Sequence, residues 1–437
     1  MELRHMYSQL NNQRGVTAVI VAICLVMLVG FIALSIDVSH ILVARNELQN
    51  AADAGALSGA GNLYLNDGTA INTNANQFGY DAAVANYSDQ LPVEVNWTSG
   101  NTGDVQRGHW SFGLGSLARG FYPNASTATA DLWGVTTEEL DENPNFINAV
   151  RVITRRQTAP VSSFFARIFG YEGFVQTAEA VAYIGFAGTI LPAEVDSPIA
   201  ICKQSLIEAD GSYDCSEGRF INDAAGDQDE ETGMWTSFDQ GLDAEGNPLS
   251  GEDPCQGGTN ASEVKPLVNC NASGVNQKML YLGRNMAVNN GQIDAAFNSF
   301  YDCWDSAYIE KFMPMTLPVI DCASDPTTCA PLVGAVEVYV VWVTQQPNLK
   351  DLPTRKEAFD DYLAWEAPDT CAADANPDQC VWDSFVGYYG LVGADNAPAA
   401  YQAKTIYLLK SCEDHIPEGV SGGENFGILA EIPVLVK

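Results

Sequence analysis

An uninterrupted apolar run over residues 16–36 constrains this chain more than any other feature. Its 21 residues include no charged side chain and no proline, and Arg14 and Asp37 border it. At 1.5 Å per residue a helix of this length is about 32 Å long, enough to cross a hydrocarbon core of about 30 Å. Because proline is absent, such a helix satisfies its own backbone hydrogen bonds inside lipid. The run therefore predicts a transmembrane helix.

Two other interpretations of this run stay open, a cleaved secretory signal and a plain single-pass anchor. The run is longer than the usual apolar part of a secretory signal, about 7–15 residues. Arg4 and Arg14 both precede it. Basic residues favour the cytoplasmic side of a membrane. We therefore expect residues 1–14 to be cytoplasmic and the bulk of the chain to be periplasmic or extracellular.

The helical pattern continues beyond Asp37 without proline, so we expect one long helix over residues 15–65. Its outer half carries small residues at four-residue intervals, in two neighbouring lines that let another backbone approach closely. This predicted helix-packing face consists of Ala51, Gly55 and Gly59 in one line and Ala52, Ala56 and Ala60 in the other.

The same segment resembles a known family. Arg-Gly before the apolar run, Asp37-Val-Ser after it, and Leu48-Gln-Asn-Ala-Ala-Asp-Ala54 further on are similar to the start of TadE/TadG-like proteins of the Flp (tight-adherence) pilus assembly system. This resemblance implies a bacterial protein that is anchored in the inner membrane. It also implies a non-enzymatic role in pilus assembly or adhesion.

The chain departs from two related patterns, and the first departure places it nearer to TadG. Pilin-like precursors are cut after a glycine and carry Glu at the fifth mature position, but counting from Gly15 that position is Ile20. Gly15 is thus only a candidate processing point. The Asp-x-Ser-x-Ser metal motif of von Willebrand A domains, which many members of the family carry, is absent from the sequence.

Residues 66–187 predict a membrane-proximal α+β domain packed on the long helix. A helix is expected within residues 70–87, and strands at 93–97 and 105–112 would form a hairpin. Pro160 predicts a short helix over residues 161–169, between strands at 148–155 and 174–186. The family resemblance extends through this region to about residue 187.

Residues 188–437 predict a cysteine-rich, mostly β distal domain. We expect a buried strand at residues 332–344, an amphipathic helix at 293–312 and a short helix at 359–365. Ten cysteines outside the apolar run predict disulfides in an exported region. The pairing cannot be read from the sequence, although near neighbours such as Cys322–Cys329 and Cys371–Cys380 suggest local loops. The candidates are Cys202, Cys215, Cys255, Cys270, Cys303, Cys322, Cys329, Cys371, Cys380 and Cys412.

Charge and motifs exclude several functions. A net charge of −34 repels nucleic acid. The cysteines lack the Cys-x-x-Cys spacing of zinc and haem sites, and no catalytic motif is present, so we expect no enzyme activity and no cofactor. Asp227, Asp229 and Glu231 alternate like the start of a calcium loop, but the glycine and glutamate of an EF-hand are missing. They remain a weak calcium candidate.

The sequence thus predicts a membrane-anchored structural or assembly component of a Flp-type pilus. Expected partners are the inner membrane, pilus-assembly or pilin-like proteins, and a second copy through the N-terminal helix. The alternative is an anchored or secreted adhesin that recognises sugar or protein and has no pilus role. An exported hydrolase is disfavoured because no motif supports it.

Overall fold

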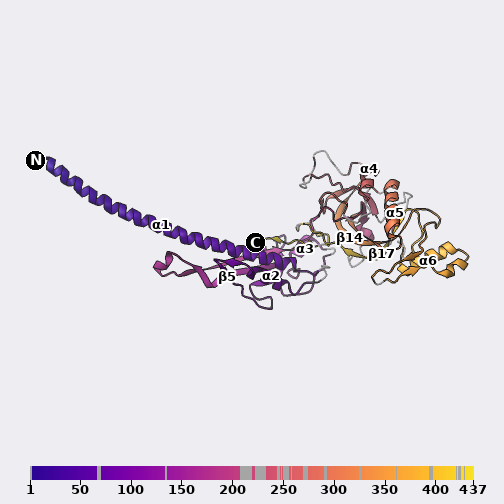
Figure 1. Cartoon of the computed structure of the whole chain (residues 1–437), viewed down its shortest axis with the longest axis horizontal. Helices are drawn as coiled ribbons and strands as arrows, with labels where there is room; N and C mark the ends of the chain where they lie inside the picture. Colours follow the sequence, from indigo (N-terminus) through magenta and orange to yellow (C-terminus); the bar gives the residue numbers. More distant parts are fainter. Residues whose placement is uncertain are drawn as a thin grey trace. The chain divides into compact units, whose positions relative to one another are not determined.

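The computed structural model of the chain divides into two compact units (Figure 1). Unit 1 comprises Met1–Thr129, Asp141–Tyr183 and Val434–Lys437, and unit 2 comprises Ala130–Leu140 and Ile184–Pro433. The structure describes residues 2–65, 70–132, 135–206, 219–221, 233–243, 247, 249, 255–256, 258–268, 274–289, 293–323, 327–360, 362–392, 397–419, 421, 425–427 and 429–437. The sequence predicts a single boundary at residue 187, but Val434–Lys437 lie in unit 1 and Ala130–Leu140 lie in unit 2.

Helix α1 (Glu2–Gly61) is the long helix that the sequence predicts. Its two halves have different surroundings. From Val16 to Ile36 nearly every side chain is exposed, whereas Ala44, Leu48 and most small residues after them are buried in unit 1. One helix is therefore both a bare apolar rod and the core element of a folded domain.

The core of unit 1 is an antiparallel five-stranded sheet in the order β18-β6-β5-β3-β4. The outer half of α1 and α2 pack on one face of it, where Val150 and Val152 meet the alanines of α1. Trp110 and Val181 lie in the cluster on the other face. The elements of unit 1 after α1 are α2 (Ala75–Val84), β1 (Tyr87–Ser88), β2 (Leu91–Pro92), β3 (Val105–Ser111), β4 (Gly120–Pro123), β5 (Ala149–Ser162), η1 (Ala166–Phe169), β6 (Gly173–Tyr183) and β18 (Val434–Leu435).

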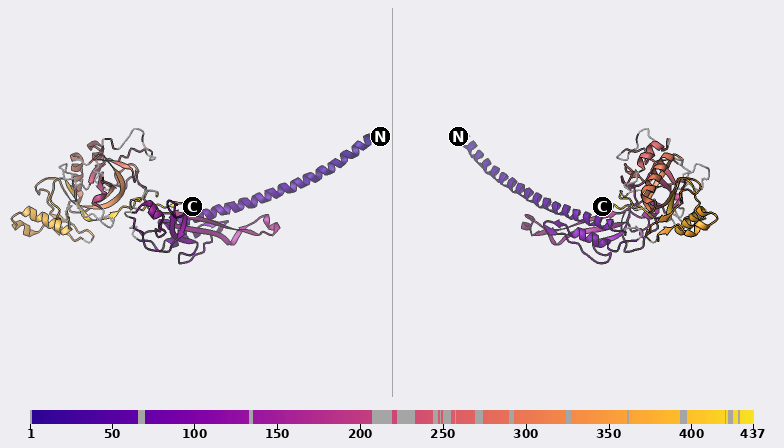
Figure 2. Two further views of the ribbon diagram at one scale, coloured as in Figure 1. Left: turned by 180° about the vertical axis from the view of Figure 1, so that it is seen from behind. Right: turned by 45° about the vertical axis from the view of Figure 1, so that its right-hand side comes forward.

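Strands β5 and β6 form a long hairpin that runs beside α1 towards its N-terminal half (Figures 1 and 2). The helix predicted for residues 161–169 is wrong. Strand β5 continues to Ser162 and only η1 is helical, because the register between Arg156 and Val161 shifts at a bulge that accommodates Pro160. The hairpin predicted between residues 93–97 and 105–112 is also wrong, since β3 pairs with β4 and β5.

Five strands of unit 2 pair in a closed ring, β12-β10-β8-β13-β14 and back to β12. Strand β14 is long enough to take two partners on one edge, β12 near its start and β17 further on. Beyond β17 the sheet ends with β9. These strands are β8 (Ile199–Cys202), β9 (Arg219–Ile221), β10 (Gly233–Thr236), β12 (Asn285–Asn289), β13 (Met313–Ile320), β14 (Cys329–Thr344) and β17 (Thr405–Asp414).

The ring separates two hydrophobic clusters because side chains alternate between the faces of a strand. Ala200 and Met234 belong to one cluster with Met286, while their chain neighbours Ile201 and Trp235 belong to the other. The second cluster also contains the apolar faces of α5 (Asp294–Tyr308) and α6 (Pro377–Tyr389). The ring strands are therefore buried on both faces.

The chain also contains several short helices and strands. The helix predicted at residues 359–365 is wrong, because β15 and β16 pair there as a small hairpin and Phe359 bridges to Tyr362. The remaining elements are α3 (Thr137–Asp141), β7 (Thr189–Ile190), η2 (Lys203–Ser205), α4 (Ala261–Val264), η4 (Lys265–Leu267), β11 (Leu280–Tyr281), β15 (Arg355–Lys356), β16 (Trp365–Glu366) and η5 (Asp369–Ala373). The predicted α+β class, with a long N-terminal apolar helix and a mostly β, disulfide-containing distal region, is confirmed.

Candidate membrane anchor and its packing face

The exposed half of α1 is a candidate membrane anchor. Helix Val16–Gly61 is long and apolar enough to cross a membrane, and its most apolar window is not buried in the protein. Cys24 lies in this segment as an exposed free cysteine, and Gly15 lies within the same helix. A bare apolar helix of this length in water would be strongly unfavourable. The segment therefore requires an apolar environment outside the described structure.

Asp37 ends the bare segment and is itself buried. Its carboxylate accepts hydrogen bonds from the backbone N–H groups of Phe164 at 2.7 Å, Phe165 at 3.1 Å and Ala166 at 2.7 Å. These N–H groups lie at the start of η1, where no backbone partner is available within the helix. The first acidic side chain after the apolar run thus holds the end of the β5–β6 hairpin against α1.

A polar junction continues this attachment one turn further along α1. His40 contacts the Ser162 carbonyl oxygen through Nδ1 at 3.1 Å and the Asp89 carboxylate through Nε2 at 3.0 Å. Ser88 donates a hydrogen bond to the Ala44 carbonyl oxygen, and the backbone N–H of Asp89 donates to Glu47. Helix α1 is therefore bound to the hairpin and to the β1–β2 turn by directional bonds as well as by packing.

A second carboxylate holds the bulge in β5. Glu94 accepts backbone hydrogen bonds from Gln157 at 3.2 Å, Thr158 at 2.8 Å and Ala159 at 2.9 Å. Burial alone would raise the pKa of Glu94, but these hydrogen bonds favour the ionised form and hold the pKa below its usual value. The bulge and the hairpin end thus each depend on one ionised acid from another element.

The predicted small-residue face lies against the sheet and α2 of the same unit. Ala51, Ala52, Ala56 and Ala60 are fully buried, in clusters that include Val150, Val152 and Ala180. Gly55 and Gly59 lie in the same interface, next to Gly79 and Val150. All six residues are covered by their own chain, which leaves this face inaccessible to a second copy.

One group of residues at this site was not predicted from the sequence. The β5–β6 connection exposes large apolar side chains where a helix was expected, and the signal was the density of Phe, Ile and Tyr between two strands. The pairing of Asp37 with this connection carried no sequence signal, because the partners are 127 residues apart.

Disulfides join distant parts of unit 2. Cys202–Cys322 ties the ends of the parallel neighbours β8 and β13, and Cys255–Cys329 holds a loop at the start of β14. The suggested local pair Cys322–Cys329 is therefore wrong, because each residue has a distant partner. Cys371–Cys380 is a local bond as suggested. Cys303 and Cys412 are also disulfide-bonded, and Cys215 and Cys270 lie outside the described residues.

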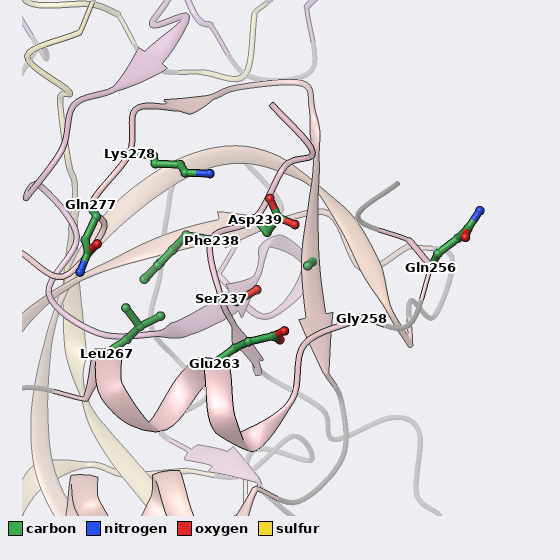
Figure 3. Close-up of a pocket in the computed structure, with 10 residues that line it drawn as sticks. Ser237, Phe238, Asp239, Gln256, Gly258, Glu263, Leu267, Gln277 and Lys278 are labelled. Carbon is green, nitrogen blue, oxygen red and sulfur yellow. The ribbon is translucent and has the colours of Figure 1, made fainter. Parts of the chain in front are cut away.

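A pocket of about 560 Å³ lies in unit 2 beside the ring of strands (Figure 3). Leu267 and Glu263 line it from the α4–η4 segment, Asp239 follows β10 and Lys278 precedes β11, while Gln256 points away from the other lining side chains in Figure 3. Among the described residues no group of three or more His, Cys, Asp and Glu is placed to hold a metal ion. Asp227, Asp229 and Glu231, the calcium candidates, lie outside the described residues.

The fold and this site define a class of protein in which an apolar N-terminal helix continues as the core helix of a small α+β domain. Residues 15–62 match the family model "Putative Flp pilus-assembly TadE/G-like", and residues 58–182 match "Putative Tad-like Flp pilus-assembly". The two matched stretches together span residues 15–182, and this part of the chain is similar to Flp pilus-assembly proteins, as the resemblance implied. Comparison with curated proteins and with solved structures found no match.

Proposed function

We propose that this chain is a single-pass, membrane-anchored, non-enzymatic assembly component of a Flp-type pilus. The observation that carries the proposal is the continuity of α1, whose bare apolar segment becomes the buried core of the domain that matches the family models. In such an arrangement a displacement of the folded domain is transmitted directly to the membrane segment, because no flexible linker separates them.

The proposed orientation places residues 1–14 in the cytoplasm and both units outside the bacterial inner membrane. Arg4 and Arg14 precede the apolar segment, and basic residues favour the cytoplasmic side. The disulfides of unit 2 support the same orientation, since such bonds persist in oxidising compartments. The expected location is therefore periplasmic or extracellular for the bulk of the chain.

The proposed partners are the inner membrane and pilus-assembly or pilin-like proteins. Self-association through the N-terminal helix would use residues 16–36, because the small-residue face further along α1 is occupied by α2, β5 and β6. The net negative charge of the chain disfavours nucleic acid as a partner for the exported units.

Deletion of the gene in its native host tests the proposal. We expect loss of surface attachment and of pili seen by electron microscopy, restored by the full chain but not by a chain carrying Leu25→Arg and Leu28→Arg. Each arginine at the centre of a membrane helix costs about 2.5–3.5 kcal/mol on insertion scales. Gly30→Ala, which meets no atom within 4 Å, is the matched control that should complement fully. Normal piliation in the deletion strain would contradict the proposal.

Fractionation and mass spectrometry test anchoring, orientation and processing. Alkaline extraction should leave the chain in the inner-membrane fraction, and protease added to spheroplasts should digest units 1 and 2. The intact mass should correspond to an uncleaved N-terminus. A mature chain that starts after Gly15 would indicate pilin-like processing, and one that starts near Ile36 would indicate a cleaved signal and contradict the anchor.

A second candidate function is an adhesin or binding module. The pocket of unit 2 favours it, because apolar Leu267 and Phe238 stand beside polar groups of both charges, Asp239, Glu263 and Lys278. Binding of the full chain to a glycan array, lost in Lys278→Ala and Asp239→Ala, would support this function.

Calcium titration followed by thermal melting tests the calcium candidate at Asp227, Asp229 and Glu231. An upward shift of the melting temperature is expected if these residues bind calcium.

A further inference from the structure

The end of the β5–β6 hairpin presents a dense apolar surface. We call residues 163–175 the hairpin tip. Ile168, Phe169 and Tyr171 are 76%, 82% and 62% exposed, which is unusual for such large side chains standing together on a soluble surface. Three further exposed members of this surface are Phe164, Phe165 and Val175. The tip therefore requires a covering that unit 1 does not provide.

The hairpin tip is fixed at one level along α1. Asp37 accepts the backbone N–H groups of Phe164 and Ala166, and the ring of His40 lies 4.9 Å from that of Phe164. Asp37 is also the first charged residue after the apolar segment. The tip is therefore held where the proposed membrane helix ends, and Figures 1 and 2 show the hairpin extending along α1 towards its N-terminal half.

Helix α1 keeps exposed apolar side chains for nearly two turns beyond Asp37. Val38, Leu42 and Val43 are 45%, 53% and 55% exposed. From residue 37 to residue 43 a helix rises about 9 Å, slightly more than the roughly 5–7 Å of one headgroup layer. An apolar environment that covers Val43 extends past the level of Asp37 and so reaches the tip.

We propose that the hairpin tip is a second membrane contact, inserted into the interfacial layer of the leaflet from which α1 emerges. This rests on the proposed membrane anchoring of α1. Tyr suits the headgroup level, where one end of its ring is apolar and the other is wet, and Phe suits the apolar layer next to it. The exposed Arg167 supplies a cation for lipid phosphate, and Glu172 is the one acid among residues 163–175.

The chemistry of the tip favours lipid over a protein partner as the occupant. The hairpin tip lies at the level where the bare apolar segment of α1 ends, and its large apolar side chains are exposed rather than packed within unit 1. The chain as a whole is strongly acidic and would be repelled by anionic lipid. A near-neutral apolar tip is the part of unit 1 that can approach such a surface without this repulsion.

Site-specific fluorescence tests the contact in the full chain. Phe169→Cys is made in a Cys24→Ser background, labelled with an environment-sensitive fluorophore, and reconstituted into protein-free vesicles of phosphatidylcholine and phosphatidylglycerol with or without nitroxide lipids. Gly100→Cys, at an open loop position of unit 1, is the matched control. Tyr171→Cys repeats the measurement if Phe169→Cys fails to fold. The Cys24→Ser chain without an added cysteine gives the background labelling.

We expect nitroxide lipids to lower the fluorescence at residue 169 about twofold and to leave residue 100 unchanged, as interfacial insertion requires. The native Cys24, labelled in the unmodified chain, reports separately on α1. Quenching at Cys24 without quenching at residues 169 and 171 would overturn the membrane contact and leave the anchor intact. Absence of quenching at Cys24 would overturn the proposed anchor itself. A tip covered in native membranes but exposed in protein-free vesicles would assign it to a protein partner and overturn the proposal.

Discussion

Gly55 of α1 and Gly79 of α2 meet at a helix crossing so close that a side chain on Gly55 would clash and one on Gly79 would be crowded. A Cβ atom on Gly55 would lie 2.8 Å from the carbonyl oxygen of Gly79 and 2.9 Å from Cβ of Ala83. A Cβ atom on Gly79 would lie 3.1 Å from the carbonyl oxygen of Gly55. The small residues of α1 thus set the distance between two helices and a sheet, which explains why they recur at four-residue intervals.

Gly55→Ala should therefore destabilise unit 1. Alanine gains roughly 1 kcal/mol in helix propensity, but the clash with backbone and with Val152 costs about 1–3 kcal/mol or more, since the backbone atoms cannot rotate away. We expect a lower midpoint in thermal unfolding of the full chain in detergent. Gly30→Ala, the same change on the bare part of α1, should leave the midpoint unchanged. Equal midpoints for both variants would contradict the tight crossing.

The sequence predicted those structural features that are determined by residues close together in the chain. Residues 16–36 indicate a candidate membrane helix by their length and apolar composition. The apolar run at 332–344 predicted a buried strand, and this holds because β14 is covered on both faces. The helix expected after Pro160 failed because a bulge also tolerates proline, and the acid that holds this bulge, Glu94, is distant in sequence. The closing of the ring by β12 and β14 likewise depends on pairing between distant strands.

Buried Lys356 should make the stability of unit 2 depend on pH. The side chain is 2% exposed, its Nζ donates to the Tyr308 carbonyl oxygen, and it lies 5.4 Å from the centre of the Trp342 ring. Burial lowers the pKa of Lys356 to about 7, although Glu310 acts in the opposite direction. An unfolded lysine has a pKa of about 10.4.

Between pH 7 and pH 9 the unfolded chain therefore keeps a proton on Lys356 that the folded chain releases. The free energy of unfolding should rise with pH across this window, by at most about 1.4 kcal/mol per pH unit, and the penalty of burying the charge is fully present below pH 7. Urea unfolding at pH 7, 8 and 9 measures the slope. Lys356→Met, which keeps the volume and removes the charge, should flatten it. An unchanged slope in this variant would contradict the assignment.

Two disulfides of very different loop length should contribute unequally to the stability of unit 2. Cys202–Cys322 separates its partners by 120 residues and Cys371–Cys380 by 9. In the loop-entropy model the first bond restricts the unfolded chain by about 5 kcal/mol and the second by about 2.5 kcal/mol. Replacing both cysteines of a pair with serine, followed by urea unfolding without reductant, should show the larger loss for Cys202 and Cys322. A larger loss for the short loop would mean that strain or residual structure outweighs loop entropy.

Loss of the Asp37 carboxylate should release the hairpin end from α1. In Asp37→Asn the side chain keeps its size but loses the charge that three backbone N–H groups share, and each hydrogen bond to a charged group contributes roughly 1.5–3 kcal/mol. We expect amide hydrogen exchange at residues 164–166 to accelerate roughly tenfold, the factor that corresponds to 1.4 kcal/mol.

The amide groups of β5 before the bulge, in residues 149–156, should keep their protection from hydrogen exchange in this variant. Their hydrogen bonds to β6 and β3 do not involve Asp37. Asp53→Asn is the matched control, since Asp53 lies on the same helix but accepts its hydrogen bond from the Gln49 side chain and not from the hairpin. Exchange measured in detergent, where no bilayer restrains the tip, isolates the effect of the carboxylate. Equal exchange rates in the native chain and in Asp37→Asn would show that packing around Phe164 and His40, rather than the buried acid, holds the hairpin to the helix.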